Sequence, residues 1–408
     1  MKLDLPFIRA QFPAFAEPSL QGWAFFENAG GSYPCSQFIN RLTSFYMKNK
    51  VQPYYPYPAS MLAGELMDES YKRMAEYLNV EASEIHFGPS TTQNVYVLAN
   101  AMRPMWQDGD EIIVSCQDHE ANAGAWRRLA ERGIKIVEWH VASETGLLSL
   151  EDLDGLFSDR TRMVAFPHCS NVIGHVNPVK EISSKAHAHG AICAVDGVAY
   201  APHGFPDLKT LGADIYLFSL YKTFGPHLGL MYVKKELIVK MENQSHFFKE
   251  GITRSMLTPA GPDHAQIGSV SGILDYFDAV YEHHFEEKAV PSQRNTALKS
   301  LFLEQEKALL ERLLGFLRSR DDIQILGTNT TDGRVPTVSI LLLNKSLDEV
   351  YAILTQHKLM LGMGDFYAVR PLMDMDIPRQ PGVLRISFLH YTSMKEIEQL
   401  IEGLKTAL

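Results

Sequence analysis

The sequence predicts an α/β fold, with a large domain on a mainly parallel seven-stranded sheet and a smaller α+β domain after it. Two observations predict this fold. From about residue 84, short apolar runs alternate with amphipathic segments, which is typical of a parallel sheet covered by helices on both faces. Several runs are apolar at every position rather than at alternate positions, as expected of strands that are buried on both faces.

Seven short apolar runs are the predicted strands of the large domain. In chain order they are Glu84–Phe87, Glu111–Ser115, Lys135–Trp139, Met163–Pro167, Ala191–Asp196, Ile215–Ser219 and Gly229–Val233. Helix-like stretches lie between several of them, at Thr92–Arg103, Ala123–Arg132 and Val179–His189. This alternation of strand and helix is the pattern of parallel strands joined by crossover helices.

The last third of the chain has a different pattern, which indicates a second domain. Ser292–Leu317 is a predicted amphipathic helix, because its leucines and phenylalanines recur near helical spacing. Strands are then predicted at Thr337–Leu343 and Val383–Phe388, and helices at Leu347–His357 and Met394–Leu404. The last helix begins with a capping-box pattern, Ser393 followed by Glu396. We expect an arm over residues 1–25 that packs with the small domain, a large domain over 26–284 and a small domain over 285–408.

Composition and charge narrow the function classes. Hydrophobic residues make up 46% of the 408 residues and charged residues 21%, which is ordinary for a globular enzyme. A net charge of −10 argues against a surface that binds nucleic acid or an anionic membrane. The four cysteines form no C-x-x-C pair, and no apolar run approaches the ~20 residues that span a bilayer. We expect a cytoplasmic protein with no membrane segment.

Lys222 follows the predicted strand Ile215–Ser219 and precedes a turn rich in glycine and proline. A lysine at a strand end that faces a cleft is desolvated, which lowers its pKa and makes it nucleophilic towards an aldehyde. Most lysines that follow strands are simply solvated. This residue alone therefore leaves both interpretations open.

Two other strand ends carry polar residues. Asp196 ends an apolar strand, where a buried carboxylate needs a partner such as a protonated pyridine nitrogen; a turn or helix-capping role is the alternative. The strand that ends near Phe87 runs into Ser90, Thr91 and Thr92 and then a helix. Backbone N–H groups, the helix dipole and the hydroxyls suit a phosphate group, and plain helix capping is the alternative.

The order of these features resembles a known group of enzymes. A phosphate-binding turn, then an aspartate, then a lysine, all at strand ends, is the layout of fold-type I enzymes that use pyridoxal 5′-phosphate (PLP). More narrowly, the chain resembles the class V aminotransferases, in their cysteine desulfurase and selenocysteine lyase branch. The matching segments are Phe26–Ala29 to "LDNAA", His168–Val179 to "HVSNVLGTxNPV", Phe218–Gly229 to "FSGHKxxGPxGxG", Gly268–Ser269 to a Gly-Thr, and Leu384–Ser387 to "VRxS".

The resemblance implies roles for individual residues. Lys222 would hold PLP as a Schiff base and then move protons at the substrate's α-carbon, while Asp196 would pair with the pyridine nitrogen. Arg385 would clamp the substrate's α-carboxylate, a bidentate task suited to guanidinium, and Asn28 would belong to the same substrate site. Residues implied to bind other cofactor groups are Thr91, Thr92, Ser219 and Tyr221 for the phosphate, and Asn171 for O3′ or the substrate carboxylate. Ser269 would reach the phosphate of a neighbouring subunit, which implies a homodimer with shared active sites.

Two departures from the family pattern concern the cofactor ring. The pyridine-stacking residue is the second histidine of the family's "EHHAN", and Glu120 holds that position. A carboxylate does not stack as a ring does, but it can act as an acid or base over the ring; alternatively, a small backbone shift brings His119 there. The family's Gln that bonds to O3′ is Ala199, unless Tyr200 or His203 supplies that hydrogen bond.

A third departure bears on the reaction. Desulfurases carry a loop cysteine in a "GHHCA" segment, whose thiolate accepts the substrate sulfur as a persulfide. The corresponding stretch is Gly364–Ala368, with Tyr367 at the cysteine position. A phenol with a pKa near ~10 does not accept sulfur as a thiolate does. We therefore expect chemistry without a persulfide, with Tyr367 either a catalytic residue or a packed loop aromatic.

These observations predict a PLP-dependent enzyme that acts on a small amino-acid substrate. A C–S or C–Se β-lyase or an aminotransferase is favoured. A PLP racemase or decarboxylase, and a non-catalytic PLP-binding or interaction protein that keeps the fold, are the alternatives. A metal site is not expected, because His187 and His189 lie in an alanine-rich helical stretch without the H-E-x-x-H spacing of a metal hydrolase.

Overall fold

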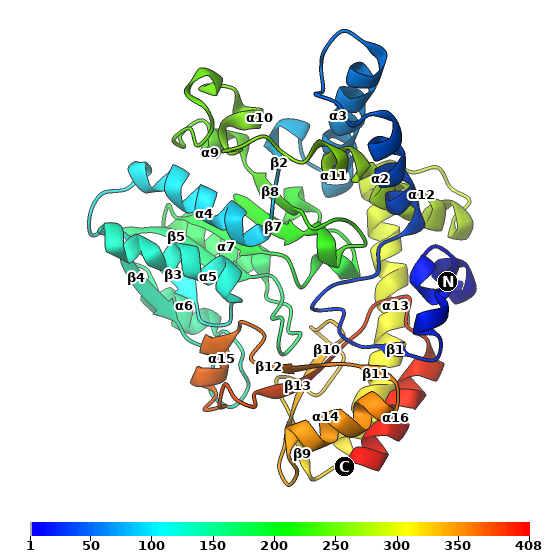
Figure 1. Cartoon of the computed structure of the whole chain (residues 1–408). Helices are drawn as coiled ribbons and strands as arrows, with labels where there is room; N and C mark the ends of the chain where they lie inside the picture. The colour runs from blue at the N-terminus through cyan, green and yellow to red at the C-terminus, as the bar shows by residue number, and fades with distance from the viewer. Residues whose placement is uncertain (1) are drawn as a thin grey trace.

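The computed structural model describes residues 2–408, and its centre is a seven-stranded sheet (Figure 1). The strand order is β2-β8-β7-β6-β5-β3-β4. Their bounds are β2 Ile85–Gly88, β3 Glu111–Ser115, β4 Lys135–Trp139, β5 Thr161–Pro167, β6 Ile192–Asp196, β7 Ile215–Ser219 and β8 Gly229–Val233. The five strands from β7 to β4 are parallel, and β8 is antiparallel to both β7 and β2. The predicted α/β fold with a mainly parallel sheet is confirmed.

The central strands are apolar throughout because helices cover both faces of the sheet. In β3, Ile112 and Val114 pack into a core that includes residues of α4 (Thr91–Met102) and α5 (Glu120–Arg127), whereas Ile113 packs into the core on the other face. Successive side chains of a strand point to opposite faces, so a strand between two helical layers has no solvent-facing position. Figure 1 shows α4 and α5 in front of these strands.

A second sheet lies in the C-terminal part of the chain. Its strand order is β12-β13-β10-β9, all antiparallel, with bounds β9 Ile323–Ile325, β10 Thr337–Leu342, β12 Gly362–Gly364 and β13 Val383–Ser387. Three helices pack with it, α13 Pro291–Arg318, α14 Leu347–Gln356 and α16 Met394–Ala407. The capping box of α16 is present, with Ser393 and Glu396 each bonded to the other's backbone N–H.

The N-terminal segment joins this C-terminal part. β1 (Ala24–Phe25) pairs in parallel with β11 (Leu359–Met360), and Glu27 forms a bridge with Ser387 of β13. Glu27 and Asn28 therefore lie beside β13, at the boundary between the two sheets. The predicted limits of the domains stay a prediction, since α13 contacts helices of both parts.

Several helices lie outside the sequence predictions. They are α2 Ser36–Lys48, α3 Pro58–Leu78, α11 His264–Ser269, α12 Ser271–His284 and α15 Val369–Asp374. The predicted helix at Ala123–Arg132 begins earlier, at Glu120, and its second half is a 3-10 turn over Arg128–Arg132. Between residues 2 and 408, no helix has both the length and the apolar character that a membrane crossing requires.

Candidate active site

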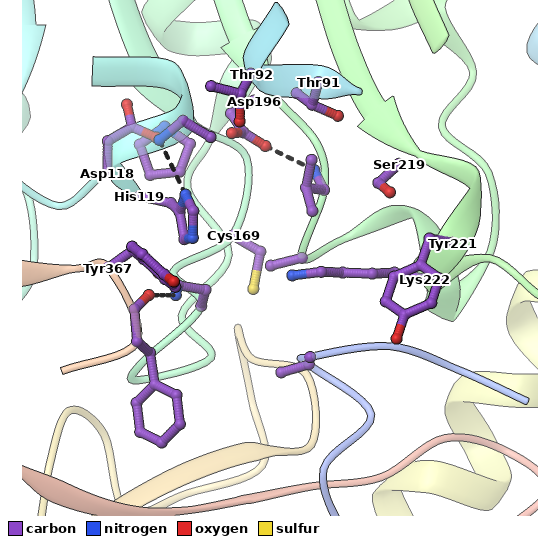
Figure 2. A pocket seen from close by; sticks show the side chains of 18 of the residues that line it. Thr91, Thr92, Asp118, His119, Cys169, Asp196, Ser219, Tyr221, Lys222 and Tyr367 are labelled. Atoms are coloured by element: carbon purple, nitrogen blue, oxygen red, sulfur yellow. Dashed lines mark hydrogen bonds between the residues drawn. The ribbon is translucent and has the colours of Figure 1, made fainter. Parts of the chain in front are cut away.

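A cavity of about 380 Å³ lies where the parallel strands end, between the large sheet and the C-terminal part (Figure 2). The segments that follow β2, β3, β5, β6 and β7 all contribute to its wall, and β13 and the segment before it close the other side. The carboxyl ends of parallel strands meet at one edge of a sheet, so residues distant in sequence converge there. Lining residues from the predicted site are Thr91, Thr92, Asn171, Asp196, Ser219, Tyr221, Lys222, Tyr367 and Arg385.

Lys222 ends the 3-10 turn Leu220–Lys222 that follows β7, and its side chain extends into the cavity (Figure 2). Within residues 2–408, no side chain or carbonyl accepts a hydrogen bond from its ammonium group. Burial and then the charge of Arg385 lower the pKa of Lys222 to about 8, against the opposing effects of Asp196 and Glu27. Lys222 is thus a weakly basic amine that is free to react with an aldehyde.

Asp196 ends β6, and its carboxylate faces the same cavity. The residue is 5% exposed, and the backbone N–H of Val198 donates to Oδ1 at 2.8 Å. Burial raises the pKa of Asp196 to about 6, while this hydrogen bond and Lys222 oppose the shift. A buried carboxylate with so few hydrogen-bonding or charged partners is suited to pair with a cation that enters the cavity.

One end of the cavity is the N-terminus of α4. Ser90 caps this helix by accepting a hydrogen bond from the Gln93 N–H, and the Thr91 hydroxyl is buried without a partner. A Cβ on Gly229 would lie 2.4 Å from the carbonyl carbon of Ser90 and 2.5 Å from the Thr91 nitrogen, so this turn requires glycine on the neighbouring strand. Exposed backbone N–H groups, a helix dipole and an unpaired hydroxyl together suit a phosphate group.

The opposite wall carries Arg385 and Asn171. Arg385 lies on β13, is 3% exposed, and donates from Nη1 to the Asn171 carbonyl at 3.1 Å. Its guanidinium is also paired with Glu27 and lies 3.7 Å from the centre of the Phe366 ring. The Asn171 side chain donates to the Phe366 carbonyl at 3.1 Å, and its Oδ1 is buried without a partner.

Of the two residues expected over the ring, Glu120 and His119, His119 lines the cavity and Glu120 does not. α5 begins at Glu120, so the carboxylate points outward to an ion pair with Arg370, whereas His119 is the N-cap and its Nδ1 accepts from the Ala121 N–H at 3.0 Å. Burial and then the charges of Lys222 and Arg385 lower the pKa of His119 to about 4. His119 is a neutral ring that is suited to stack on an aromatic cofactor.

Tyr367 lies at the mouth of the cavity, 5.4 Å from the His119 ring between ring centres (Figure 2). It is 71% exposed, and its backbone carbonyl accepts from the Glu120 N–H at 2.9 Å. Phe366 and Tyr367 both have positive φ angles, 52° and 56°, which few non-glycine residues adopt. The phenol is therefore held at the rim rather than packed in a core.

Two predicted site residues lie elsewhere. Asn28 is buried behind the cavity, where its side chain donates to the Ser387 carbonyl and accepts from the Tyr391 hydroxyl; it joins the N-terminal segment to β13. Ser269 is fully buried in α11 and donates to the Ala265 carbonyl at 2.6 Å. Neither residue lines the cavity, and the role of Ser269 towards a neighbouring subunit stays a prediction.

The cavity also contains residues that the sequence reasoning missed. Glu27, rather than Asn28, lines the wall, and it is paired with Arg385. Cys169 also lines the cavity, between His119 and Lys222 (Figure 2). Asp118 is buried with one oxygen bonded to Asn122 and the other unpartnered, and burial together with Asp196 raises its pKa well above the usual range. Tyr200 and His203, the expected substitutes for the family's Gln, do not line this cavity; Tyr200 stacks on His168.

Comparison with known proteins decides the family. The family model "Aminotransferase class-V" matches residues 24–251 and 299–400. The chain belongs to the class-V aminotransferase family. An aminotransferase-like protein of Gibberella zeae is 33% identical over 412 residues, which cover 98% of both proteins. A cysteine desulfurase-like protein of Aspergillus flavus is 29% identical over 97% of this chain and 88% of that protein.

Solved structures show that this class-V aminotransferase has the fold of cysteine desulfurases. It superimposes on a cysteine desulfurase of Thermococcus onnurineus with a TM-score of 0.85, covering 100% of this chain and 98% of the other at 22% identity. For the cysteine desulfurase CsdA of Escherichia coli the TM-score is 0.83, with 100% and 99% covered at 22% identity. The fold-type I architecture expected from the sequence is confirmed.

Class-V aminotransferases use PLP, and the cavity of this member fits that cofactor. Four buried polar atoms of its lining residues lack partners: Thr91 Oγ1, Asn171 Oδ1, Asp118 Oδ1 and Arg385 Nε. Buried polar groups are rarely left unpaired, so unpaired atoms around one cavity indicate a polar ligand. Lys222 and Asp196 supply the amine and the carboxylate that an aldehyde and a pyridinium require. Which residue contacts which cofactor atom stays a prediction.

Proposed function

We propose that this class-V aminotransferase acts on a small amino acid without persulfide chemistry, as a C–S or C–Se β-lyase or as an aminotransferase. The observation that carries the proposal is Tyr367 at the rim of the cavity, where the desulfurases have their loop cysteine. Lys222, Asp196 and Arg385 share one cavity, so a covalent anchor, a carboxylate for the ring and a cation for the substrate are all available.

The chain's own residues divide the work as follows. The cofactor supplies an electrophilic aldehyde and an electron-accepting ring. Lys222 would hold the cofactor and would remove or return the proton at the substrate's α-carbon. Asp196 would pair with the pyridine nitrogen, His119 would stack on the ring, and Thr91 would bind the phosphate. Further contacts are assigned to Thr92, Ser219 and Tyr221 for the phosphate, and to Asn171 and Arg385 for the substrate carboxylate.

The remaining thiol in the cavity is a poor sulfur acceptor. Cys169 is 2% exposed, its Sγ donates to the Ser170 carbonyl at 3.6 Å, and burial raises the pKa of its thiol. The thiolate, not the thiol, is the nucleophile that attacks sulfur. Cys169 also belongs to the chain segment after β5 rather than to a loop at the cavity mouth. These facts support a reaction that needs only the cofactor and Lys222.

The reaction is tested by its products. S-methyl-L-cysteine is incubated with the holoenzyme, and a β-lyase is expected to convert it with one water into pyruvate, ammonia and methanethiol. An aminotransferase instead requires an added 2-oxo acid and yields the matching amino acid. The Lys222→Ala variant is the control, expected to lose both activity and the borohydride-reducible adduct. Formation of L-alanine from L-cysteine, with the sulfur retained on the protein as a persulfide, would contradict the proposal.

We also propose that the protein forms a homodimer. Eight large apolar side chains are exposed in the segment that links α2 to α3 and its flanking turns: Tyr46, Met47, Val51, Tyr54, Tyr55, Tyr57, Met61 and Leu62. Such a concentration on a monomer surface supports a protein interface, and a second copy of the chain is the simplest occupant. Light scattering after size-exclusion chromatography is expected to give twice the mass of one chain. A Tyr55→Glu and Leu62→Glu double variant is expected to give the mass of a single chain.

A further inference from the structure

Glu27 is ion-paired with the guanidinium of Arg385, the group proposed to bind the substrate carboxylate. Its carboxylate Oε1 is ion-paired with Arg385 Nη2, within the cavity wall. Arg385 is 3% exposed and the Glu27 side chain 27%, so the pair is shielded from water on one side and reaches the cavity on the other. A charge pair in such surroundings is stronger than one at the surface.

Two glycines distant in sequence make room for this carboxylate. A Cβ on Gly30 would lie 1.8 Å from Glu27 Oε2, and a Cβ on Gly362 would lie 2.7 Å from Glu27 Oε1. Neither glycine has a positive φ angle, so its backbone does not demand glycine. The space for Glu27 is thus formed by β12 and by the turn after Glu27 itself, which indicates a specific place for the carboxylate rather than a chance surface contact.

With Glu27 in this place, both terminal nitrogens of Arg385 are engaged. Nη1 donates to the Asn171 carbonyl, Nη2 is engaged with Glu27, and Nε is buried without a partner. Phe366 covers one face of the guanidinium. A bidentate carboxylate requires two parallel N–H donors on one edge. Nη2 becomes available to such a carboxylate when Glu27 moves away.

We propose that Glu27 is a specificity-determining residue, a built-in competitor that the substrate's carboxylate must displace from Arg385. The inference rests on the proposed function for the identity of the substrate group. Glu27 weakens the binding of every amino acid by the same competition, and it leaves amines without a carboxylate unaffected. Glu27 touches no reacting atom, so it sets the affinity for the substrate rather than the rate of the chemical step.

The test compares two ligands that differ only in the carboxylate. L-alanine and ethylamine are titrated into the holoenzyme while the absorbance of the bound cofactor is followed. Glu27→Gln removes the charge, and Glu27→Asp keeps the charge on a side chain one methylene shorter, which no longer reaches Arg385. Both variants are expected to bind L-alanine about tenfold more tightly and ethylamine within twofold of the parent. Glu120→Gln is the matched control, because it breaks a glutamate–arginine pair that lies outside the cavity.

A second readout uses the protein without cofactor and does not depend on the proposed function. Phenylglyoxal is applied to the apo protein, and modification of Arg385 is followed by peptide mass spectrometry. Arg385 is expected to react faster in Glu27→Gln than in the parent, and acetate is expected to protect it at about tenfold lower concentration. Tighter alanine binding with unchanged Arg385 reactivity, or weaker alanine binding in both variants, would overturn the proposal. If neither ligand perturbs the cofactor but Arg385 reactivity rises as expected, the proposed function fails and the competition by Glu27 stands.

Discussion

The lowered pKa of Lys222 gives a quantitative prediction for cofactor loading. With a pKa of about 8, about one Lys222 in ten is neutral at pH 7, against about one in three thousand for a lysine at its ordinary value of 10.5. Only the neutral amine attacks the aldehyde. The rate at which apo protein takes up PLP is therefore expected to rise about tenfold from pH 7 to pH 9 and then to level off. A solvated lysine would give a rise of about a hundredfold over the same interval, without a plateau.

Two neighbouring groups titrate mainly below this interval. His119, with a pKa of about 4, and Asp196, with a pKa of about 6, complete their titrations below it. The assay mixes apo protein with PLP and records the growth of the absorbance of the bound cofactor at each pH. Nα-acetyl-lysine, measured alongside, corrects for the ionisation of PLP itself. A rate that still climbs at pH 10, or one that does not change between pH 7 and 9, would refute the pKa argument.

Three further outcomes are expected. Thr91→Val weakens PLP binding about tenfold in a cofactor titration of the apo protein, because the lost hydroxyl has no other partner; an unchanged affinity would remove Thr91 from the phosphate site. Asn28→Ala lowers the free energy of unfolding in urea by about 1–3 kcal/mol, because the Asn28 side chain is hydrogen-bonded to Ser387 and Tyr391. The affinity for L-alanine stays within twofold of the parent. A large loss of that affinity would support the predicted role of Asn28 in substrate binding. Glu306→Ala lowers the free energy of unfolding by about 3–5 kcal/mol, because Glu306 and His203 form a buried pair at 2.8 Å; a loss below about 1 kcal/mol would contradict this.

The sheet was predictable because burial on both faces leaves a simple signature. The runs at Glu111–Ser115, Lys135–Trp139, Ile215–Ser219 and Gly229–Val233 are strands with the predicted bounds. Three of them, β3, β7 and β8, have no exposed position, so the interior of each run is apolar. β4 is the edge strand, where Lys135 is exposed and Glu138 is half-buried. The convergence of Thr91, Asp196 and Lys222 in one cavity then follows from parallel topology.

The side chains that face into the cavity were less predictable, because a shift of one residue reverses their direction. Glu120 and His119 are neighbours, and the start of α5 decides that the imidazole points inward. Glu27 and Asn28 alternate in extended chain beside β13, so one lines the cavity and the other lies behind it. Ser269 is the last residue of α11 and its hydroxyl donates to the Ala265 carbonyl, which a Gly-Ser pair does not indicate. Such choices depend on where elements begin, the least certain part of any sequence pattern.

Because Glu27 and Arg385 are 358 positions apart, the cavity wall that they form is completed late in synthesis. All seven strands of the large sheet, with Lys222 and Asp196, have been synthesised once β8 is made, while one wall of the cavity is still missing. That wall arrives only when β13 emerges, roughly 10–30 s later at ordinary rates of translation. Until then the half-formed pocket presents a reactive lysine without the arginine that recognises carboxylates. Chains truncated before β13 are thus expected to react with aldehydes through Lys222. They are not expected to bind amino acids in preference to simple amines.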